Sequence, residues 1–348
     1  MPSSHGYAAF NAQSPLAPFS FTRREPGPTE IVVEILYCGV CHSDLHMARN
    51  EWGQSIYPMV PGHEIVGRVV AAGNAVTKFK QGGIAAIGVI IDSCRVCSPC
   101  KRGEEHFCDQ GPTLTYAATD RVDGSITMGG YANNYVVDER FGHTVPENLD
   151  LAAVAPLLCA GITTYSPLRH WKVGPGKKVG IVGLGGLGHM GLKFAHSLGA
   201  HVVQFTTNLR KKEDALKLGA DEVVLSTDPA AMKAHTKTFD FILDTVSAQH
   251  PLEPYLDLLK LDSTLTMVGL PEVPPTVSPF ALIGKRISVA GSMIGGMPET
   301  QEMLDYCGRY NIVSEVEVIP MQNINEAFER LLKQDVKYRF VIDMSTLG

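Results

Sequence analysis

The sequence predicts an α/β protein with two domains, one mainly β and one built around a doubly wound parallel sheet. Three observations lead to this prediction. The chain has 348 residues, more than one ordinary core accommodates. Its first half contains short apolar runs bounded by Gly and Pro. From about Ala155 onward, strand patterns alternate with helix patterns.

The first half is expected to hold the strands of the β-rich domain. Apolar runs of this length between Gly and Pro favour strands over helices. We expect strands at residues 30–37, 65–71, 84–91 and 131–137, and an irregular loop at 110–130.

The second half has the pattern of a parallel sheet. Apolar strands without alternation, separated by helices, indicate a sheet covered on both faces. We expect strands at residues 178–183, 201–205, 222–225, 241–244, 264–268 and 287–290, and helices at 186–198 and 211–218. The tail from about Met297 predicts helices at 298–310 and 323–333, a short strand between them and a closing strand at 339–342. We expect this tail to return to the first domain.

Composition and charge exclude several classes of protein. Apolar residues make up 45% and charged residues 19%, which is typical of a globular protein. The net charge of −6 disfavours a polyanionic partner such as nucleic acid. No apolar run reaches the roughly 20 residues of a membrane span, and the first ten residues lack the pattern of a secretory signal. We therefore expect a cytoplasmic protein with no nucleic-acid or membrane partner.

A glycine-rich turn joins the first strand of the second half to its helix. In the pattern Gly183-x-Gly185-x-x-Gly188, the first glycine allows a tight turn, the second a close approach of a pyrophosphate and the third close packing of helix on strand. Such glycines alone also occur in ordinary turns, but the strand–turn–helix context favours a dinucleotide site. The predicted contacts of this turn are Gly183, Leu184, Gly185, Gly186, Leu187 and Gly188.

The end of the next strand predicts which dinucleotide binds. An NAD site usually has an acidic residue about 20 residues after the glycines, to bind the ribose 2′-hydroxyl. Here the segment contains no acid and offers hydroxyls, an amide and two cations, from Thr206, Thr207, Asn208, Arg210 and Lys211. These groups suit the 2′-phosphate of NADP(H). The alternative is that Arg210 and Lys211 are only the solvated start of a helix.

Four of the eight cysteines crowd into fifteen residues, as Cys94-x2-Cys97-x2-Cys100-x7-Cys108. In a reducing compartment, clustered cysteines are more often metal ligands than disulfides. Four thiolates close a tetrahedral structural zinc site. The alternatives are disulfides, an iron–sulfur cluster and a nucleic-acid-binding zinc knuckle. The fourth cysteine lacks the x3 spacing and following proline of a ferredoxin run, and only three cations lie near the lobe.

A second set of metal-ligating residues is dispersed along the chain. Cys41, His63 and Cys159 supply two thiols and an imidazole, the ligand set of a catalytic zinc with one open position. Each residue alone is unremarkable, because a buried cysteine is usually a small hydrophobic group.

These motifs occur together in one order. The runs Cys41-His42-Ser43-Asp44-Leu45-His46 and Gly62-His63-Glu64, the four-cysteine lobe and the GLGGLGHMG turn resemble the zinc-containing medium-chain alcohol dehydrogenases. The similarity is strongest to the cinnamyl-alcohol-dehydrogenase-like branch of NADP-dependent aldehyde reductases, and it covers nearly the whole chain. It implies a GroES-like catalytic domain at residues 1–156 and 296–348 and a Rossmann domain at 157–295. One departure is Gly82-Gly83-Ile84, where the family usually reads Gly-Asp-x-Val.

The resemblance also implies roles for individual residues. Cys41, His63 and Cys159 would hold the catalytic zinc, with Glu64 behind it or joining it transiently and Asp44 orienting His63. Ser43 would receive the substrate hydroxyl proton and pass it through the cofactor ribose to His46. For His46, a partly exposed loop histidine is the alternative. Further residues implied to line the cofactor are Thr163, Thr245, Gly269, Ser292, Met293 and Ile294.

The function implied is a zinc-dependent oxidoreductase that interconverts primary alcohols and a broad range of aromatic and aliphatic aldehydes, with reduction favoured. It would use two Zn²⁺ per chain and NADP(H), and it would form a homo-oligomer, since family members are commonly dimers or tetramers. Two alternatives remain. A zinc-free quinone reductase of the same superfamily would lack both cysteine sets, and a non-catalytic dinucleotide-binding structural protein would show no turnover.

Overall fold

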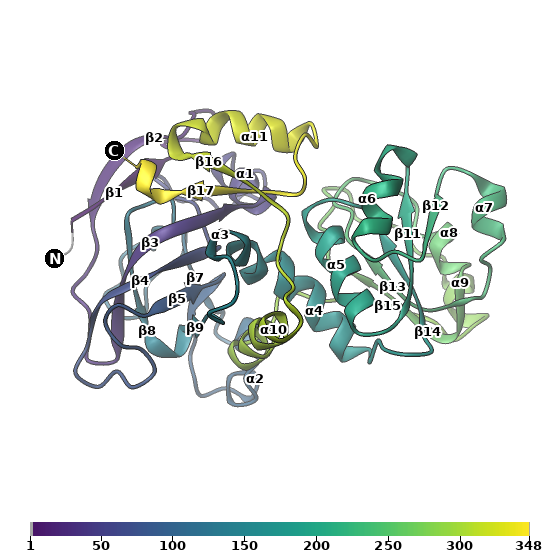
Figure 1. Cartoon of the computed structure of the whole chain (residues 1–348), viewed down its shortest axis with the longest axis horizontal. Coiled ribbons are helices and arrows are strands. Elements are labelled where there is room, and N and C mark those ends of the chain that lie inside the picture. Colours follow the sequence, from purple (N-terminus) through teal and green to yellow (C-terminus); the bar gives the residue numbers. More distant parts are fainter. Residues whose placement is uncertain (1–2, 348) are drawn as a thin grey trace. The chain divides into compact units, whose positions relative to one another are not determined.

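The structure is a computed structural model that describes residues 3–347. The chain forms two compact units, Met1–Cys159 with Gly295–Gly348 and Ala160–Ile294 (Figure 1). The prediction of an α/β fold is confirmed. Among the described residues, no single helix is long and apolar enough to cross a membrane, although the bent pair Leu151–Leu158 and Ala160–His170 reaches that length and composition together.

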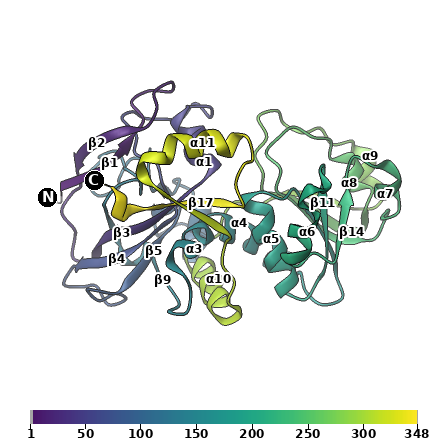
Figure 2. The same ribbon diagram turned by 45° about the horizontal axis from the view of Figure 1, so that its top comes forward.

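A seven-stranded sheet forms the centre of the first unit. Its strand order is β16-β17-β3-β4-β5-β9, and β8 also pairs with β3. Figure 2 shows β17, β3, β4 and β5 in this succession. The strands are β3 (Glu30–Val40), β4 (Ile65–Ala72), β5 (Ile84–Ile87), β8 (Asn134–Asp138), β9 (Gly142–Thr144), β16 (Val316–Pro320) and β17 (Arg339–Asp343).

Two small sheets and five helices complete this unit. The small sheets pair β1 (Ser3–Ala8) with β2 (Ala17–Thr22) and β6 (Ile90–Asp92) with β7 (Thr113–Leu114). The helices are α1 (His42–Ala48), α2 (Ser98–Lys101), α3 (Leu151–Val154), α10 (Met297–Tyr310) and α11 (Ile324–Leu332). The strands β1, β2 and β9 and the helices α1, α2 and α3 were not predicted.

Three predictions for the first half need correction. The strand expected at 84–91 is two strands, β5 and β6, and at the break between them the carbonyls of Gly88 and Val89 accept hydrogen bonds from Thr115. The strand expected at 131–137 begins only at Asn134, and the loop expected at 110–130 contains β7. The departure at Gly82-Gly83-Ile84 does not prevent β5 from forming at Ile84.

The register of the seven-stranded sheet gathers distant residues at one corner. β4 and β17 both run antiparallel to β3, with Ile65 opposite Cys38 and Phe340 opposite Val40. The residues that follow β3, precede β4 and begin β17 therefore meet at the same edge.

The second unit is a six-stranded parallel sheet with the order β12-β11-β10-β13-β14-β15. All six strands were predicted: β10 (Lys178–Val182), β11 (His201–Thr206), β12 (Glu222–Leu225), β13 (Phe239–Asp244), β14 (Leu259–Met267) and β15 (Ser288–Gly291). The first of them lies inside the sheet, so the chain reverses its direction of winding between β10 and β13, where open α/β sheets bind ligands.

Six helices accompany this sheet. They are α4 (Ala160–His170), α5 (Gly186–Ser197), α6 (Lys212–Lys217), α7 (Pro229–Lys233), α8 (Glu253–Leu256) and α9 (Pro279–Ile283). α5 packs on β10 and β11, α6 and α7 pack on β12, and α8 packs on β14. A cluster that includes Phe205, Phe239, Ile242 and Leu265 fills the core, because the strands are apolar on both faces.

Candidate active site

Four potential ligands meet at the corner of the first unit. Cys41 follows β3, His63 and Glu64 precede β4, and Cys159 follows the 3-10 turn Ala155–Leu158. Their ligand atoms all lie within 4.8 Å of one another. The sulfurs of Cys41 and Cys159 are 3.8 Å apart. A disulfide requires about 2.05 Å, whereas two ligands at ~2.3 Å from a tetrahedral zinc lie about 3.8 Å apart. The donor set and its spacing therefore fit zinc.

Asp44 orients the imidazole of this cluster. Its Oδ1 lies 3.0 Å from His63 Nδ1, and the carboxylate is fully buried. It also accepts hydrogen bonds from the backbone N–H groups of Cys41 (2.9 Å) and Gly62 (3.0 Å) and from the Tyr131 hydroxyl (3.2 Å). Because Nδ1 is engaged, the ring presents Nε2 as its metal-ligating atom. Tyr131 was not predicted as a site residue.

Arg339 is a second residue that the sequence did not reveal. It begins β17, and its guanidinium donates to the carboxylate of Glu64, with both side chains buried. Burial raises the pKa of Glu64 to about 7, because desolvation outweighs the attraction of Arg339. Burial alone would lower the pKa of Arg339, but Glu64 and the two thiols raise it well above its ordinary value. The cluster thus has a buried positive charge beside its acidic ligands.

The proposed proton-relay residues lie on α1. Ser43 Oγ is 3.6 Å from Cys41 Sγ, and His46 follows one helical turn later. His46 was expected on a loop; the segment is helical because Asp44 and Cys41 form a capping box at its start. His46 Nδ1 contacts Glu51, and its ring packs on Trp52 with 5.2 Å between centroids. Its side chain is partly exposed.

The four-cysteine lobe forms a closed cluster. The ligand atoms of Cys94, Cys97, Cys100 and Cys108 lie within 4.8 Å of one another, and the sulfurs of Cys94 and Cys100 are 3.9 Å apart. Backbone N–H groups of Cys97 and Cys94 point at the sulfurs of Cys94 and Cys108, each at 3.4 Å. All eight cysteines lie among the described residues and none is in a disulfide. Four thiols at zinc spacing leave no open position, as in a structural site.

The glycine-rich turn has the shape of a phosphate cradle. Gly183 has φ +90°, and a Cβ on Gly188 would lie 2.1 Å from Gly183 O. Both glycines are thus required by the packing of the turn itself. A Cβ on Gly185 would meet no atom within 4 Å. The open space at Gly185, next to the start of α5, fits a pyrophosphate.

The other predicted cofactor residues collect at the carboxyl edge of the same sheet. Thr206 ends β11, Thr245 follows β13, Gly269 comes shortly after β14, and Ser292 follows β15. This is the edge at which open parallel sheets bind ligands. The remaining residues of this set, Thr163 on α4 and Met293 and Ile294 after β15, lie in the same unit.

Several residues predicted for the 2′-phosphate have partners within the turn. Thr206 Oγ1 bonds the backbone of Asn208, and Asn208 Oδ1 accepts from the N–H of Arg210 at 2.9 Å. Lys211 Nζ donates to Leu184 O at 3.1 Å. The side chains of Thr207 and Arg210 lie at the surface. These contacts shape the loop. Of the two predicted cations, Arg210 is exposed and Lys211 is half-buried.

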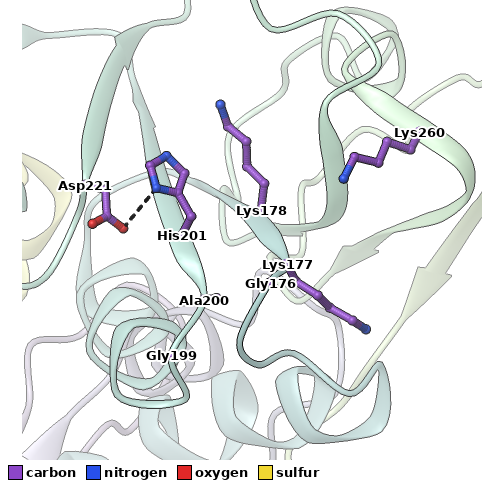
Figure 3. Close-up of a pocket in the computed structure, with 8 residues that line it drawn as sticks. All are labelled: Gly176, Lys177, Lys178, Gly199, Ala200, His201, Asp221 and Lys260. Atoms are coloured by element: carbon purple, nitrogen blue, oxygen red, sulfur yellow. Dashed lines mark ion pairs between the residues drawn. The ribbon is translucent and has the colours of Figure 1, made fainter.

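A separate pocket lies at the opposite, amino-terminal edge of this sheet (Figure 3). Its lining includes Lys178, His201 and Lys260. Lys260 Nζ is 2.8 Å from Asp240, and His201 is paired with Asp221. Lys178 is also 3.6 Å from Glu222, and Lys177 Nζ donates to the backbone carbonyl of Trp171, so the lysines of this pocket already have partners within the protein.

Comparison with known proteins identifies both units. Residues 27–147 match the model of the alcohol dehydrogenase GroES-like domain, and residues 186–308 match that of the zinc-binding dehydrogenase family. The chain is 57% identical over 343 residues to aldehyde reductase YahK of Escherichia coli, covering 97% of each chain. Two solved structures are similar, each 44% identical and covering 99% of this chain and 98% of its own. They are a cinnamyl alcohol dehydrogenase of Sorghum bicolor, with a TM-score of 0.96, and a CAD from Helicobacter pylori complexed with NADP(H), with a TM-score of 0.92.

These findings confirm the predicted resemblance, the pairing of a GroES-like with a Rossmann-like domain, and the cofactors zinc and NADP(H). They disfavour a zinc-free quinone reductase, which would lack the two cysteine clusters that the structure assembles. The chain belongs to the zinc-containing medium-chain alcohol dehydrogenases, in the branch of the cinnamyl alcohol dehydrogenases.

Proposed function

We propose that this chain reduces a broad range of aromatic and aliphatic aldehydes to primary alcohols with NADPH, and catalyses the reverse oxidation less efficiently. The observation that carries the proposal is the cluster of Cys41, His63 and Cys159, with its sulfurs at zinc spacing. With Glu64 held by Arg339, these three ligands would leave one zinc position for a substrate. The relative from Escherichia coli is named an aldehyde reductase, which supports reduction as the main direction.

Each cluster of ligands has a distinct role in this proposal. Cys41, His63 and Cys159 hold a catalytic zinc, with Glu64 able to approach it, and the Cys94–Cys108 lobe holds a structural one. The bound cofactors supply the chemistry, since zinc is a Lewis acid for the substrate oxygen and NADPH donates the hydride. Arg339 keeps a positive charge beside the two thiols and favours their deprotonated form.

Ser43 and His46 provide the route for the proton. During aldehyde reduction the substrate oxygen gains a proton from Ser43 Oγ, which lies next to the ligand Cys41. His46, which lies on the same helix, would return the proton to Ser43, and the ribose of a bound cofactor would supply hydroxyl groups for this relay. Because His46 Nδ1 contacts Glu51, its Nε2 is the atom that exchanges the proton. Alcohol oxidation uses the same atoms in reverse.

Cofactor contacts lie in the unit Ala160–Ile294, which we propose as the dinucleotide-binding domain, with the other unit as the catalytic domain. The turn from Gly183 to Gly188 holds the pyrophosphate, and Arg210 binds the 2′-phosphate, assisted by Thr207 and the polar groups of Thr206, Asn208 and Lys211. Thr163, Thr245, Gly269 and residues 292–294 line the rest of the cofactor site.

We also propose a homo-oligomer in the cytoplasm. On α9, which precedes the edge strand β15 in the chain, Phe280 is 87% and Ile283 76% exposed. Apolar side chains exposed to this degree favour a protein–protein interface. None of the eight cysteines is in a disulfide, which favours a reducing compartment. Sedimentation analysis of Phe280→Asp beside the parent tests the oligomer, and an unchanged assembly would place the interface elsewhere.

The central test is turnover of the purified, zinc-loaded protein. We expect NADPH oxidation with a panel of aldehydes, at a higher kcat/KM than NADP⁺ reduction with the matching alcohols. Zinc removal by a chelator should abolish both reactions, and restored zinc should recover them. NADPH oxidation that persists at the parent rate without zinc would contradict the proposal.

A further inference from the structure

The glycine-rich turn is held by a buried glutamine that no motif predicts. Gln204 lies on β11, and its side chain is fully buried in the core of a parallel sheet. Its Nε2 donates to Gly183 O and to Phe205 O, each at 2.8 Å. Its Oε1 is buried without a hydrogen-bond partner.

The orientation of this amide follows from its surroundings. If the amide were reversed, Oε1 would face two carbonyl oxygens, so the donor must point at the turn. An orphaned buried oxygen is costly. A polar residue that carries this cost in an apolar strand is a mark of a functional position.

Gln204 is one of three side chains that hold successive carbonyls of the turn. Thr245 Oγ1 donates to Val182 O at 2.7 Å, Gln204 to Gly183 O, and Lys211 Nζ to Leu184 O at 3.1 Å. In a trans peptide the N–H points opposite to its C=O. Holding the carbonyl of Gly183 toward the buried Gln204 therefore turns the N–H group of Leu184 the other way. That is where the backbone must present donors to a pyrophosphate.

We propose that Gln204 is a positioning residue for the pyrophosphate of the dinucleotide, acting through the Gly183–Leu184 peptide. The inference rests on the proposed function, since it presumes that this turn binds NADP(H). The pyrophosphate is common to NADPH and NADH, whereas the 2′-phosphate belongs to NADPH alone. Loss of Gln204 therefore weakens both cofactors equally, in contrast to loss of Arg210.

The test measures binding of NADPH and NADH to the zinc-loaded protein by titration calorimetry. Gln204→Met removes the donors and keeps the volume. We expect the Kd for both cofactors to rise about tenfold, which corresponds to ~1.4 kcal/mol. The matched control is Thr266→Val, which removes a buried hydroxyl without a partner from β14 of the same sheet. Its affinities should equal those of the parent.

A second variant covers the case that Gln204→Met does not fold. Gln204→Glu keeps size and polarity but turns a carboxylate toward two carbonyls. It should also weaken both cofactors, less so at acidic pH, where a protonated carboxyl donates one hydrogen bond. For either variant, affinities within about twofold of the parent, or weakening of NADPH alone, would overturn the inference. A parent protein that binds neither cofactor would instead overturn the proposed function, and this inference with it.

Discussion

The buried ion pair between Arg339 and Glu64 allows a sharp test of how the active-site corner is held together. Arg339→Met removes the guanidinium and keeps most of the side-chain volume. Glu64 is then left in a fully buried position without its partner, since its carboxylate is 0% and the arginine side chain 3% exposed.

The expected loss follows from this burial. Removing one member of a buried pair typically costs about 3–5 kcal/mol, because the remaining charge is desolvated without compensation. Glu64 has a pKa of about 7 even beside Arg339, so it escapes part of this cost by binding a proton. We therefore expect the free energy of unfolding to fall by about 3 kcal/mol, the lower end of that range.

Urea unfolding, together with zinc analysis of the folded protein, measures the effect. The control is Arg330→Met, the same change at a pair between Arg330 and Glu317 whose side chains are 30% and 42% exposed. It should change the stability far less, because solvent screens exposed pairs. The double variant Arg339→Met/Glu64→Gln should regain part of the loss, since it removes the unpaired charge. Equal losses for the two arginine variants, or no recovery in the double variant, would refute the reasoning.

Four further predictions concern the two zinc sites, the cofactor, the proton route and the core. Metal analysis should find two zinc ions per chain. Cys97→Ser should lose one of them and destabilise the lobe, whereas Cys159→Ala should keep the fold but lose turnover. Near-parent activity of Cys159→Ala would contradict the catalytic assignment. Arg210→Ala should reduce kcat/KM for NADPH by about tenfold to a hundredfold, as expected for one lost charge-assisted contact, and leave NADH use nearly unchanged. A parent protein that uses both cofactors equally well would contradict the assignment of Arg210. Ser43→Ala should lower turnover by about 10²-fold or more with zinc content and NADPH affinity retained, and near-parent rates across neutral pH would mean that the proton takes another path. Burial lowers the pKa of His143 to about 3, so below about pH 6.5 the unfolded chain binds a proton that the folded chain excludes. The free energy of unfolding should therefore fall as the pH drops from about 6.5 toward 3, and His143→Leu should remove up to about 1.4 kcal/mol per pH unit of this slope. Identical acid unfolding curves for the parent and the variant would contradict this prediction.

The sequence alone predicted the strands of the parallel-sheet unit and two of its six α-helices, α5 and α6, and it suggested the ligand sets. Each of the six strands was predicted at least in part, from a short apolar stretch. β14 begins at Leu259 and not at residue 264, because Lys260, Asp262 and Ser263 interrupt its apolar pattern. The turn at Gly183 and the Cys94–Cys108 lobe were recognised in the sequence because each depends on the spacing of residues only a few positions apart. Such spacing determines the local structure directly. The strands of the first unit were predicted less completely. The strands β1, β2 and β9 were missed, and the strand predicted at 84–91 was wrongly continuous, because short strands are defined by their pairing with distant segments.

Only the tertiary structure decided which distant residues serve the site. Arg339 meets Glu64 across 275 positions of sequence because β17 pairs antiparallel with β3, and Tyr131 reaches Asp44 across 87. In the sequence, Gln204 is only one polar residue in an apolar strand. The structure shows that its amide donates a hydrogen bond to the carbonyl of Gly183. Strand pairing and register arise from long-range burial and hydrogen bonding, which leave no local pattern in the sequence. The residues to which we assign the chemistry could therefore be proposed from the sequence, and the residues that position them became visible only in the fold.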